Sequence, residues 1–399
     1  TAFSISIASA ILLIGVITLV YDVLGGIRIV ILSDVLQMMI IVVGIVICGA
    51  VALYLVGWES AWSTLSPERF QILDFKRWGL SPEGSYAFWP MTIGGIFLYA
   101  SYYGCDQSQV QRELTVGSVD DVRKSLMVNA LGRFPLVLMY CLLGVLVGAI
   151  FASPDSLNHI ASMMKIDSQS VSQMLENNPD RMMPLFIFSY LPHGVIGFIF
   201  VAIMAALMSS LDSGLNSLSA VTMRDFYQKY IKQESDDRQY LIASKSITLF
   251  WGIFCIVAAL LFAELGEATR HTTIVLINAV GSLLYGPILA AFLLGMFTTR
   301  VGARAVKIGV VAGILLNIYL WIFTPFSWLW WNFTGFTGSV AAVLLISTFY
   351  GNNEADKFST VESIQATDDS SKKWKTIYKL TVLYFFLIIF ISYLIERTG

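Results

Sequence analysis

The sequence predicts an all-α protein that crosses a membrane many times. Of its 399 residues, 56% are hydrophobic and only 13% are charged, and the mean hydropathy is +0.72. Soluble domains carry about 25% charged residues. The apolar residues form runs of about 20, the length of a bilayer-spanning helix. A membrane β-barrel would instead alternate apolar and polar residues over about ten positions, and a net charge of −2 leaves no basic excess for nucleic acid.

Apolar runs mark about ten expected membrane-spanning helices. In chain order they are Phe3–Tyr21, Ile27–Val56, Phe88–Tyr103, Leu126–Phe151, Val195–Met223, Leu241–Glu264, Thr272–Phe297, Val306–Phe323, Leu329–Phe349 and Ile377–Ile395. Three longer polar stretches separate some of them. Trp58–Tyr86 is a loop rich in Trp and Pro, Pro154–Met183 has room for a short helix, and Gly351–Trp374 is a charged linker.

Lysine and arginine are distributed unevenly among the loops. When the turn Asp22–Arg28 is placed in the cytoplasm and the spans alternate, most of the 25 basic residues fall on the cytoplasmic side, as the positive-inside rule requires. We therefore expect residues 57–86 to form an extracytoplasmic loop and residues 350–374 a cytoplasmic linker. The chain opens at Thr1 inside an apolar run, so we expect it to be the C-terminal part of a longer protein or a processed chain.

Cysteines and histidines give no sign of a cofactor. All four cysteines fall inside apolar runs, and the three histidines have no paired spacing. The sequence therefore predicts neither a disulfide framework nor a metal-ligand cluster of these residues.

Four charged residues lie within or beside the predicted spans, where a charge is costly and often marks an ion or substrate path. Three of them have a structural alternative. Asp34 would lie at the membrane interface, Asp106 would end its helix, and Arg133 would extend its head group to the cytoplasmic surface. Asp212 follows a long apolar stretch and is harder to explain in this way.

Small and hydroxyl-bearing residues share one face of the helix around Asp212. Ala206, Ser209, Ser210 and Ser213 recur at helical spacing. Such a stripe allows close helix packing, but packing does not require a carboxylate. Hydroxyl and carboxylate oxygens are suitable ligands for a small hard cation. The segment predicts either an ion site or a packing seam, and the acidic residue favours the ion site.

The third span contains features that disagree with a continuous helix. The pair Gly94–Gly95 lies mid-span, and the polar run 104–112 follows it. Glycine and polar residues at membrane depth indicate a discontinuous helix whose freed backbone lines a cavity. Tyr103, Asp106 and Gln107 there are suited to a small polar ligand. The alternative is that the span simply ends where the polar run begins.

Four sequence blocks resemble the solute:sodium symporter family, which includes sodium-coupled transporters of sugars, sialic acid, iodide, vitamins and monocarboxylates. In order they are Tyr21–Gly26 followed by Ser33–Gln37, then Asp106-Gln107-x-x-x-Gln111-Arg112, then Leu191-Pro192-x-Gly194 leading into the serine stripe and Asn216-Ser217, and finally Gly286-Pro287 through Phe297. Any one block is weak evidence for this resemblance, but four blocks in the right order are strong evidence for it.

The resemblance implies the LeuT-type fold, a five-plus-five inverted repeat with extra helices. Residues 1–56 would be the last two helices of repeat one, residues 87–297 the five helices of repeat two with a break near 104–106, and residues 298–349 and 375–399 peripheral helices. The first broken helix, whose backbone carbonyls contribute to the sodium site in relatives, would then precede Thr1.

The resemblance also implies sodium-binding positions. The matching residues are Ala206 (through its carbonyl), Ser209 and Ser210 for the family's second sodium site, and Asp34, Ser209 and Ser213 for an additional site found in some members. Asp212 stands where sialic acid and glucose relatives have a hydroxyl. If Asp34 and Asp212 face one another, they would bind sodium tightly or share a proton.

For the solute, Asp106 and Gln107 match the Asn-Gln pair of sugar transporters or the Asp-Gln pair of the iodide, vitamin and monocarboxylate branch. Arg133 falls near a galactose-contacting lysine, and Asn278 aligns roughly with a sugar-contacting glutamine. An arginine holds a carboxylate in a bidentate manner. An anionic solute is therefore favoured over a neutral sugar, unless Arg133 pairs with Asp106.

The expected function is sodium-coupled symport of a small organic solute by alternating access, in a bacterial inner membrane. The expected partners are the solute, sodium ions and the lipid bilayer, without nucleic acid, cofactor or enzymatic activity. The alternatives are a membrane sensor, a sodium-independent channel or exchanger, and a truncated scaffold. The tail Gly351–Gly399 is too short for a kinase domain, and the Asp34 and Ser209 constellation argues against a channel, but the scaffold stays open.

Overall fold

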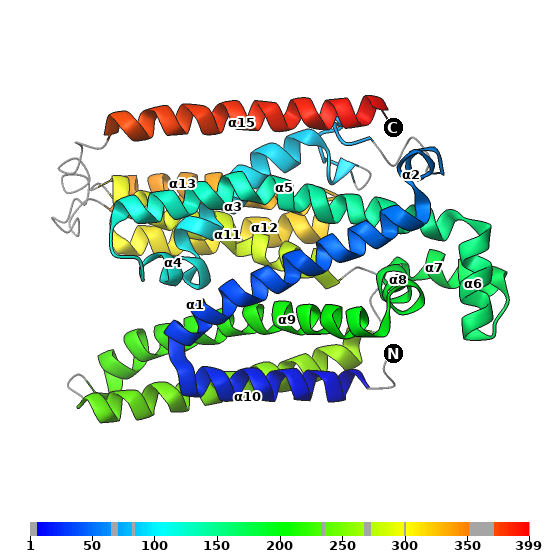
Figure 1. Cartoon of the computed structure of the whole chain (residues 1–399). Coiled ribbons are helices and arrows are strands. Elements are labelled where there is room, and N and C mark those ends of the chain that lie inside the picture. Colours follow the sequence, from blue (N-terminus) through cyan, green and yellow to red (C-terminus); the bar gives the residue numbers. More distant parts are fainter. Residues whose placement is uncertain are drawn as a thin grey trace. The chain divides into compact units, whose positions relative to one another are not determined.

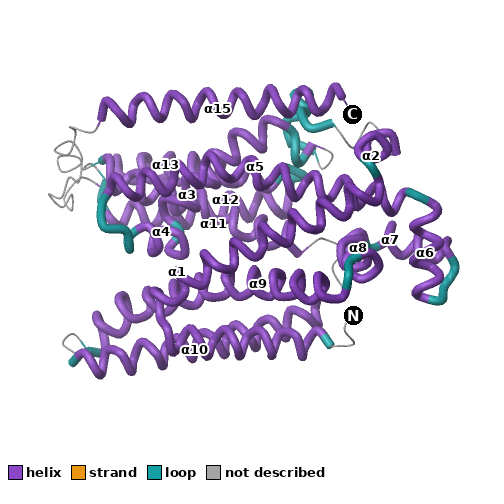
Figure 2. Tube along the Cα trace, in the orientation of Figure 1, coloured by secondary structure: helices purple, strands orange, loops and turns teal. Residues whose placement is uncertain are grey.

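The computed structural model describes residues 6–64, 71–81, 84–232, 236–266, 273–298, 301–350 and 371–398. Helices joined by loops make up these ranges, with no strand among them (Figure 2). Nine helical segments in the described part are long and apolar enough to cross a membrane. Large apolar side chains such as Phe250 and Leu383 are 61% and 64% exposed on them, as expected where lipid replaces water around the protein. The predicted all-α, multi-pass class is confirmed.

The chain divides into two compact units, Thr1–Phe70 with Ser118–Ala268 and Gly399, and Gln71–Gly117 with Thr269–Thr398. The helices of unit 1 are α1 (Ile7–Val56), α2 (Trp58–Thr64), α5 (Val119–Ala152), α6 (Pro154–Met164), α7 (Ser168–Asn177), α8 (Met182–Tyr190), α9 (His193–Val221) with its π-helical continuation Thr222–Ile231, and α10 (Asp237–Gly266). Those of unit 2 are the π-helical turn Pro90–Gly94, α3 (Gly95–Cys105), α4 (Gln107–Glu113), α11 (Thr273–Phe297), α12 (Ala303–Phe323), α13 (Trp328–Tyr350) and α15 (Ser371–Thr398).

Helix α1 contains the first two predicted spans. Figure 1 shows that it changes direction sharply between a first part, Ile7–Gly25, and a second part, Val30–Val56. The expected turn at Asp22–Arg28 is therefore a bend inside a helix rather than a non-helical loop. The first part packs on α10, and the second part packs on α9, where Gly44 lies against Ile199.

The expected loop Pro154–Met183 folds into more structure than its polar composition suggests. Helices α6 and α7 bury an apolar side, with Ile160 and Val171 fully covered, against Phe186 of α8. Asp167 caps α7, because its carboxylate accepts a hydrogen bond from the Ser170 N–H at 2.9 Å. Polar residues such as Asp167 thus cap these helices, and the few apolar residues of the segment form the core between the helices.

Unit 2 is organised around a proline inside α11. Pro287 has no N–H, so the carbonyl of Leu283 one turn earlier loses its helical donor. Asn317 of α12, which is fully buried, donates from Nδ2 to the Leu283 carbonyl at 3.0 Å and to the Trp331 carbonyl of α13 at 2.9 Å. Its Oδ1 accepts from the Thr334 hydroxyl at 3.0 Å. One amide therefore joins three helices and satisfies the carbonyl freed by the proline.

The third predicted span, Phe88–Tyr103, is helical in the structure and extends two residues beyond its expected end. The π-helical turn Pro90–Gly94 leads into α3, which ends at Cys105. Asp106 has extended backbone angles (φ −76°, ψ 119°), and α4 begins directly after it. The helix is thus interrupted inside the expected 104–106 stretch. A Cβ atom on Gly94 would meet the Leu329 carbonyl of α13, so glycine permits the close approach of these two elements.

Candidate functional site

A hydrogen bond in unit 1 connects the two helices that carry the expected ion ligands. The Ser209 hydroxyl of α9 donates to Asp34 Oδ1 on the second part of α1 at 2.5 Å. Both residues are partly buried. The contact brings a carboxylate and a hydroxyl together although 175 residues separate them in the chain.

The rest of the serine stripe bonds along its own helix. The Ser210 hydroxyl donates to the Ala206 carbonyl at 3.2 Å, and the Ser213 hydroxyl donates to the Ser209 carbonyl at 2.8 Å. Serine hydroxyls often bond in this way to the carbonyl four residues earlier. Carbonyl and hydroxyl oxygens therefore lie on the same turn as the Asp34 contact, an arrangement suited to a small hard cation.

Asp212 is completely buried, and neither of its carboxyl oxygens has a hydrogen-bond partner among the described residues. Its backbone carbonyl accepts from Asn216 Nδ2 at 3.0 Å, and the same nitrogen donates to Asp22 Oδ1 at 3.3 Å. Asp22 is 3% exposed and is not among the ligands that the sequence predicts. Its only signal in the sequence is a carboxylate after an apolar run, three residues before the pair Gly25–Gly26.

The expected solute residues of unit 2 gather at the break between α3 and α4. Asp106 Oδ1 accepts from the Ser108 N–H at 2.8 Å and from the Ser108 hydroxyl at 2.7 Å, so Asp106 caps α4. The Tyr285 hydroxyl of α11 lies 3.5 Å from Asp106 Oδ2. Asp106 is therefore also a structural residue of the break. Tyr285 was missed because its neighbours in the sequence show only the apolar pattern of a span.

The other expected solute residues do not all meet. Tyr103 lies near the break, with its ring 5.1 Å from that of Tyr102 between centroids. Gln107 is the first residue of α4 and is exposed. Asn278 is exposed on α11, two helical turns before Tyr285. Arg133 is exposed on α5 and belongs to unit 1, so neither unit by itself assembles the complete expected set.

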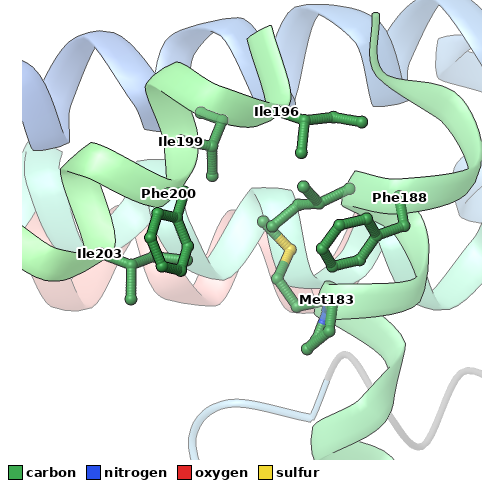
Figure 3. Close-up of a pocket in the computed structure, with 8 residues that line it drawn as sticks. Met183, Phe188, Ile196, Ile199, Phe200 and Ile203 are labelled. Atoms are coloured by element: carbon green, nitrogen blue, oxygen red, sulfur yellow. The ribbon is translucent and has the colours of Figure 1, made fainter. Parts of the chain in front are cut away.

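A pocket of about 250 Å³ lies between α8 and α9 (Figure 3). Its lining is entirely apolar, and the residues are Met183, Pro184, Ile187, Phe188, Ile196, Ile199, Phe200 and Ile203. A second apolar cavity, of about 190 Å³, extends from this region to Ala206. Solute sites usually combine apolar walls with a few convergent polar groups. None of the expected solute residues lines either cavity, so these cavities are not the polar site that the sequence predicts.

Comparison with known proteins identifies relatives of this chain. Residues 1–313 match the sodium:solute symporter family. The chain is 28% identical to the human sodium/iodide cotransporter over 321 residues, which are 79% of the chain and 46% of that protein. It is 27% identical to the sodium/glucose cotransporter of Vibrio parahaemolyticus over 386 residues, covering 93% and 68% of the two proteins. The chain therefore spans about half the length of the human relative.

Two further comparisons concern sialic acid transporters. The chain is 27% identical to the sodium/sialic acid symporter NanT of Aliivibrio fischeri over 361 residues, or 89% of the chain and 67% of the relative. The solved structure of a Na+-coupled sialic acid symporter, substrate-bound and outward-open, covers 87% of the chain with a TM-score of 0.70 and 23% identity, and the match covers 68% of that structure. This likeness confirms the expected LeuT-type fold. With the family match over most of its length, the chain belongs to the sodium:solute symporter family.

Proposed function

We propose that this chain is the part of a sodium-coupled symporter that holds the coupling ion and contributes to the site of a small organic solute. The observation that carries the proposal is the direct bond between Asp34 and Ser209, which places a carboxylate against the hydroxyl stripe of α9. Family membership and the sodium-coupled relatives support it. A packing seam alone would not need the carboxylate.

The proposed sodium ligands fall into two groups. Ala206 through its carbonyl, Ser209 and Ser210 form one, and Asp34 with Ser209 and Ser213 forms the other. Ser209 belongs to both, so the occupancy of one group affects the other through the same hydroxyl. Asp212, on the same helix as the serines, is a further proposed sodium ligand outside these two groups. Sodium entry driven by a membrane potential supplies about 2.3 kcal/mol per charge for each 100 mV, and coupling requires that sodium and solute stabilise each other's binding.

The proposed solute residues are Tyr103, Asp106, Gln107, Asn278 and Arg133. Asp106 is held by Ser108 and Tyr285, so it presents a preorganised acceptor at the helix break. Arg133 belongs to unit 1 and is proposed from the resemblance alone, as the cation for a carboxylate-bearing solute. We favour an organic anion and keep a neutral sugar as the second class, since the relatives include transporters of both. Two bacterial relatives support a bacterial inner membrane as its location.

Uptake into proteoliposomes tests the proposal. The full-length protein that contains this chain would be reconstituted and offered sialic acid, monocarboxylates and sugars, with an inward sodium gradient or with potassium in place of sodium. We expect sodium-dependent uptake of one solute. Ser209→Ala should abolish sodium dependence, and Asp34→Asn should raise the sodium concentration needed for half-maximal uptake.

Ser246→Ala is a matched control, because Ser246 is an exposed serine of α10 whose hydroxyl bonds within its own helix to the Ile242 carbonyl. It should leave uptake unchanged. Uptake that is equal in sodium and potassium, or sodium-dependent uptake that survives Ser209→Ala, would contradict the proposed ion site.

A further inference from the structure

We propose a further cation site in unit 1 that does not use Ser209, where the first part of α1 meets α9 and α10. Thr18 and Asp22 of α1 and Asp212 of α9 supply the oxygen ligands, and the ligand is a small hard cation, with sodium as the ion tested. The site concerns ion binding alone and does not require that the protein transports the solutes proposed above.

The first observation is a set of buried oxygens without hydrogen-bond donors. Thr18 and Asp212 are 0% exposed, and Asp22 is 3% exposed. Among the described residues, Thr18 Oγ1, Asp22 Oδ2 and both carboxyl oxygens of Asp212 have no hydrogen-bond partner. Buried polar atoms are almost always paired, and a buried carboxylate needs a compensating charge. These buried, unpaired oxygens of α1 and α9 are therefore suited to bind a cation, whose charge would compensate the carboxylates.

The second observation is the bridge through Asn216. Its Nδ2 lies 3.3 Å from Asp22 Oδ1 and 3.0 Å from the Asp212 carbonyl. This places Asp22 beside the turn of α9 that begins with Asp212. Thr18 lies four residues before Asp22, so both side chains project from the same face of α1. Asn216 leaves Asp22 Oδ2 unpaired, so it positions the carboxylate without satisfying it.

The relative direction of the helices indicates which residues of α1 and α9 lie opposite one another beyond the Asn216–Asp22 contact. Gly15 of α1 lies against Ile256 of α10, and Leu19 lies against Gly252. Residues later in α1 therefore contact residues earlier in α10, so the two segments run antiparallel. Figure 1 shows the first part of α1 alongside α10.

Helices α9 and α10 follow each other in the chain and also run antiparallel, since Ser219 bonds to Thr248 at 2.9 Å. The first part of α1 is therefore parallel to α9. A step of four residues back on each helix from the Asn216–Asp22 contact leads to Asp212 on α9 and Thr18 on α1. We infer from the parallel direction that these two turns face one another.

The chemistry of this set suits a small hard cation, because such ions prefer carboxylate and hydroxyl oxygens as ligands. Sodium is the ion to test, because the chain belongs to the sodium:solute symporter family. A sodium-sized ion here would connect the first part of α1 to the helix that carries Ser209.

Equilibrium binding of radioactive sodium to the purified full-length protein tests the site. We expect the wild-type protein to bind two classes of sodium ion, one at the ligand groups that share Ser209 and one at the site of Thr18 and Asp22. Thr18→Val keeps the side-chain volume and removes only a hydroxyl that has no partner, so the variant should fold. It should weaken one class at least tenfold, and Asp22→Asn should weaken the same class.

Ser217→Ala is the matched control, because its buried hydroxyl on α9 already bonds to the Ser213 carbonyl at 2.7 Å, and it should leave both classes intact. Ser209→Ala should remove only the other class, which separates this proposal from the proposed function. A single class that is lost in Ser209→Ala, or an isotherm unchanged by both Thr18→Val and Asp22→Asn, would overturn the further site.

Discussion

Asn317 should be one of the most important single side chains for the stability of unit 2. We expect Asn317→Ala to remove the amide that joins α11, α12 and α13. Its contacts with the carbonyls of Leu283 and Trp331 and with the Thr334 hydroxyl are 2.9–3.0 Å long. Because Pro287 has no N–H, the Leu283 carbonyl has no helical donor to replace the lost amide.

The size of the effect follows from these partners. A buried carbonyl left without a donor costs about 1–3 kcal/mol. Hydrogen bonds between membrane helices contribute about 0.6 kcal/mol on average, and Thr334 keeps a bond to the Trp330 carbonyl at 3.1 Å. We therefore expect Asn317→Ala to lower the free energy of unfolding by about 2–4 kcal/mol.

A double-mutant cycle isolates the proline contribution. Pro287→Ala restores an N–H that can reach the Leu283 carbonyl, so Asn317→Ala should do less damage in that background. The coupling free energy between the two substitutions should be about 1–3 kcal/mol, the cost of the orphaned carbonyl.

The assay is reversible unfolding of the full-length protein in bicelles by titration with denaturing detergent, for the wild type, both single variants and the double variant. Thr337→Ala is a control on α13, because its exposed hydroxyl bonds only to carbonyls of its own helix in the contacts described. If the effects of Asn317→Ala and Pro287→Ala add within about 0.5 kcal/mol, the amide does not compensate for the proline and the reasoning is wrong.

Three further predictions concern other parts of the chain. Gly286→Ala should lower the melting temperature, because a Cβ there would meet the Asn332 carbonyl and the Phe336 nitrogen of α13. A melting temperature equal to that of the wild type would show that α11 and α13 can move apart without loss of stability. The sequence Asn332-Phe333-Thr334 matches the acceptor pattern for N-linked glycosylation, but Asn332 is fully buried. It should therefore stay unmodified when the protein is expressed in a eukaryotic host, and the added mass of a glycan on the folded protein would refute this. Hydrogen bonds from Ser170 hold the pKa of the Asp167 carboxyl below its usual value. The stabilisation that this cap gives α7 is therefore fully present above the ordinary aspartate pKa and is lost as the pH falls through the lowered pKa. Asp167→Ala should speed amide exchange in α7 at neutral pH and make that exchange less dependent on acidification, and unchanged exchange would exclude the cap.

Much of the fold could be predicted from the sequence because a bilayer imposes simple rules on each segment separately. The last four expected spans, for example, agree with α11, α12, α13 and α15 to within a few residues at most ends. A run of apolar residues must close its backbone bonds internally, so its helical state follows from composition alone. The bend of α1 and the helices α6 and α7 were less predictable, because they depend on packing against α9, α10 and α8.

The candidate ion site was predictable only in part. The stripe Ala206–Ser213 and the isolated Asp34 were visible, because hydroxyls and a carboxylate in an apolar helix stand out. Asp22 was overlooked because its partner Asn216 lies 194 residues away. Likewise, nothing near Tyr285 in the chain indicates that its hydroxyl approaches Asp106.

The helical, membrane-spanning class and the family of this protein follow from its sequence, because helix length, hydropathy and family motifs are properties of single segments. The sequence also contains the oxygen-bearing residues from which an ion site can be built. Which of these oxygens meet, and which have no donor, depends on how the helices pack. Bends, helix direction and close glycine contacts set the hydrogen-bond partners between helices, and these arise only when separate segments come together.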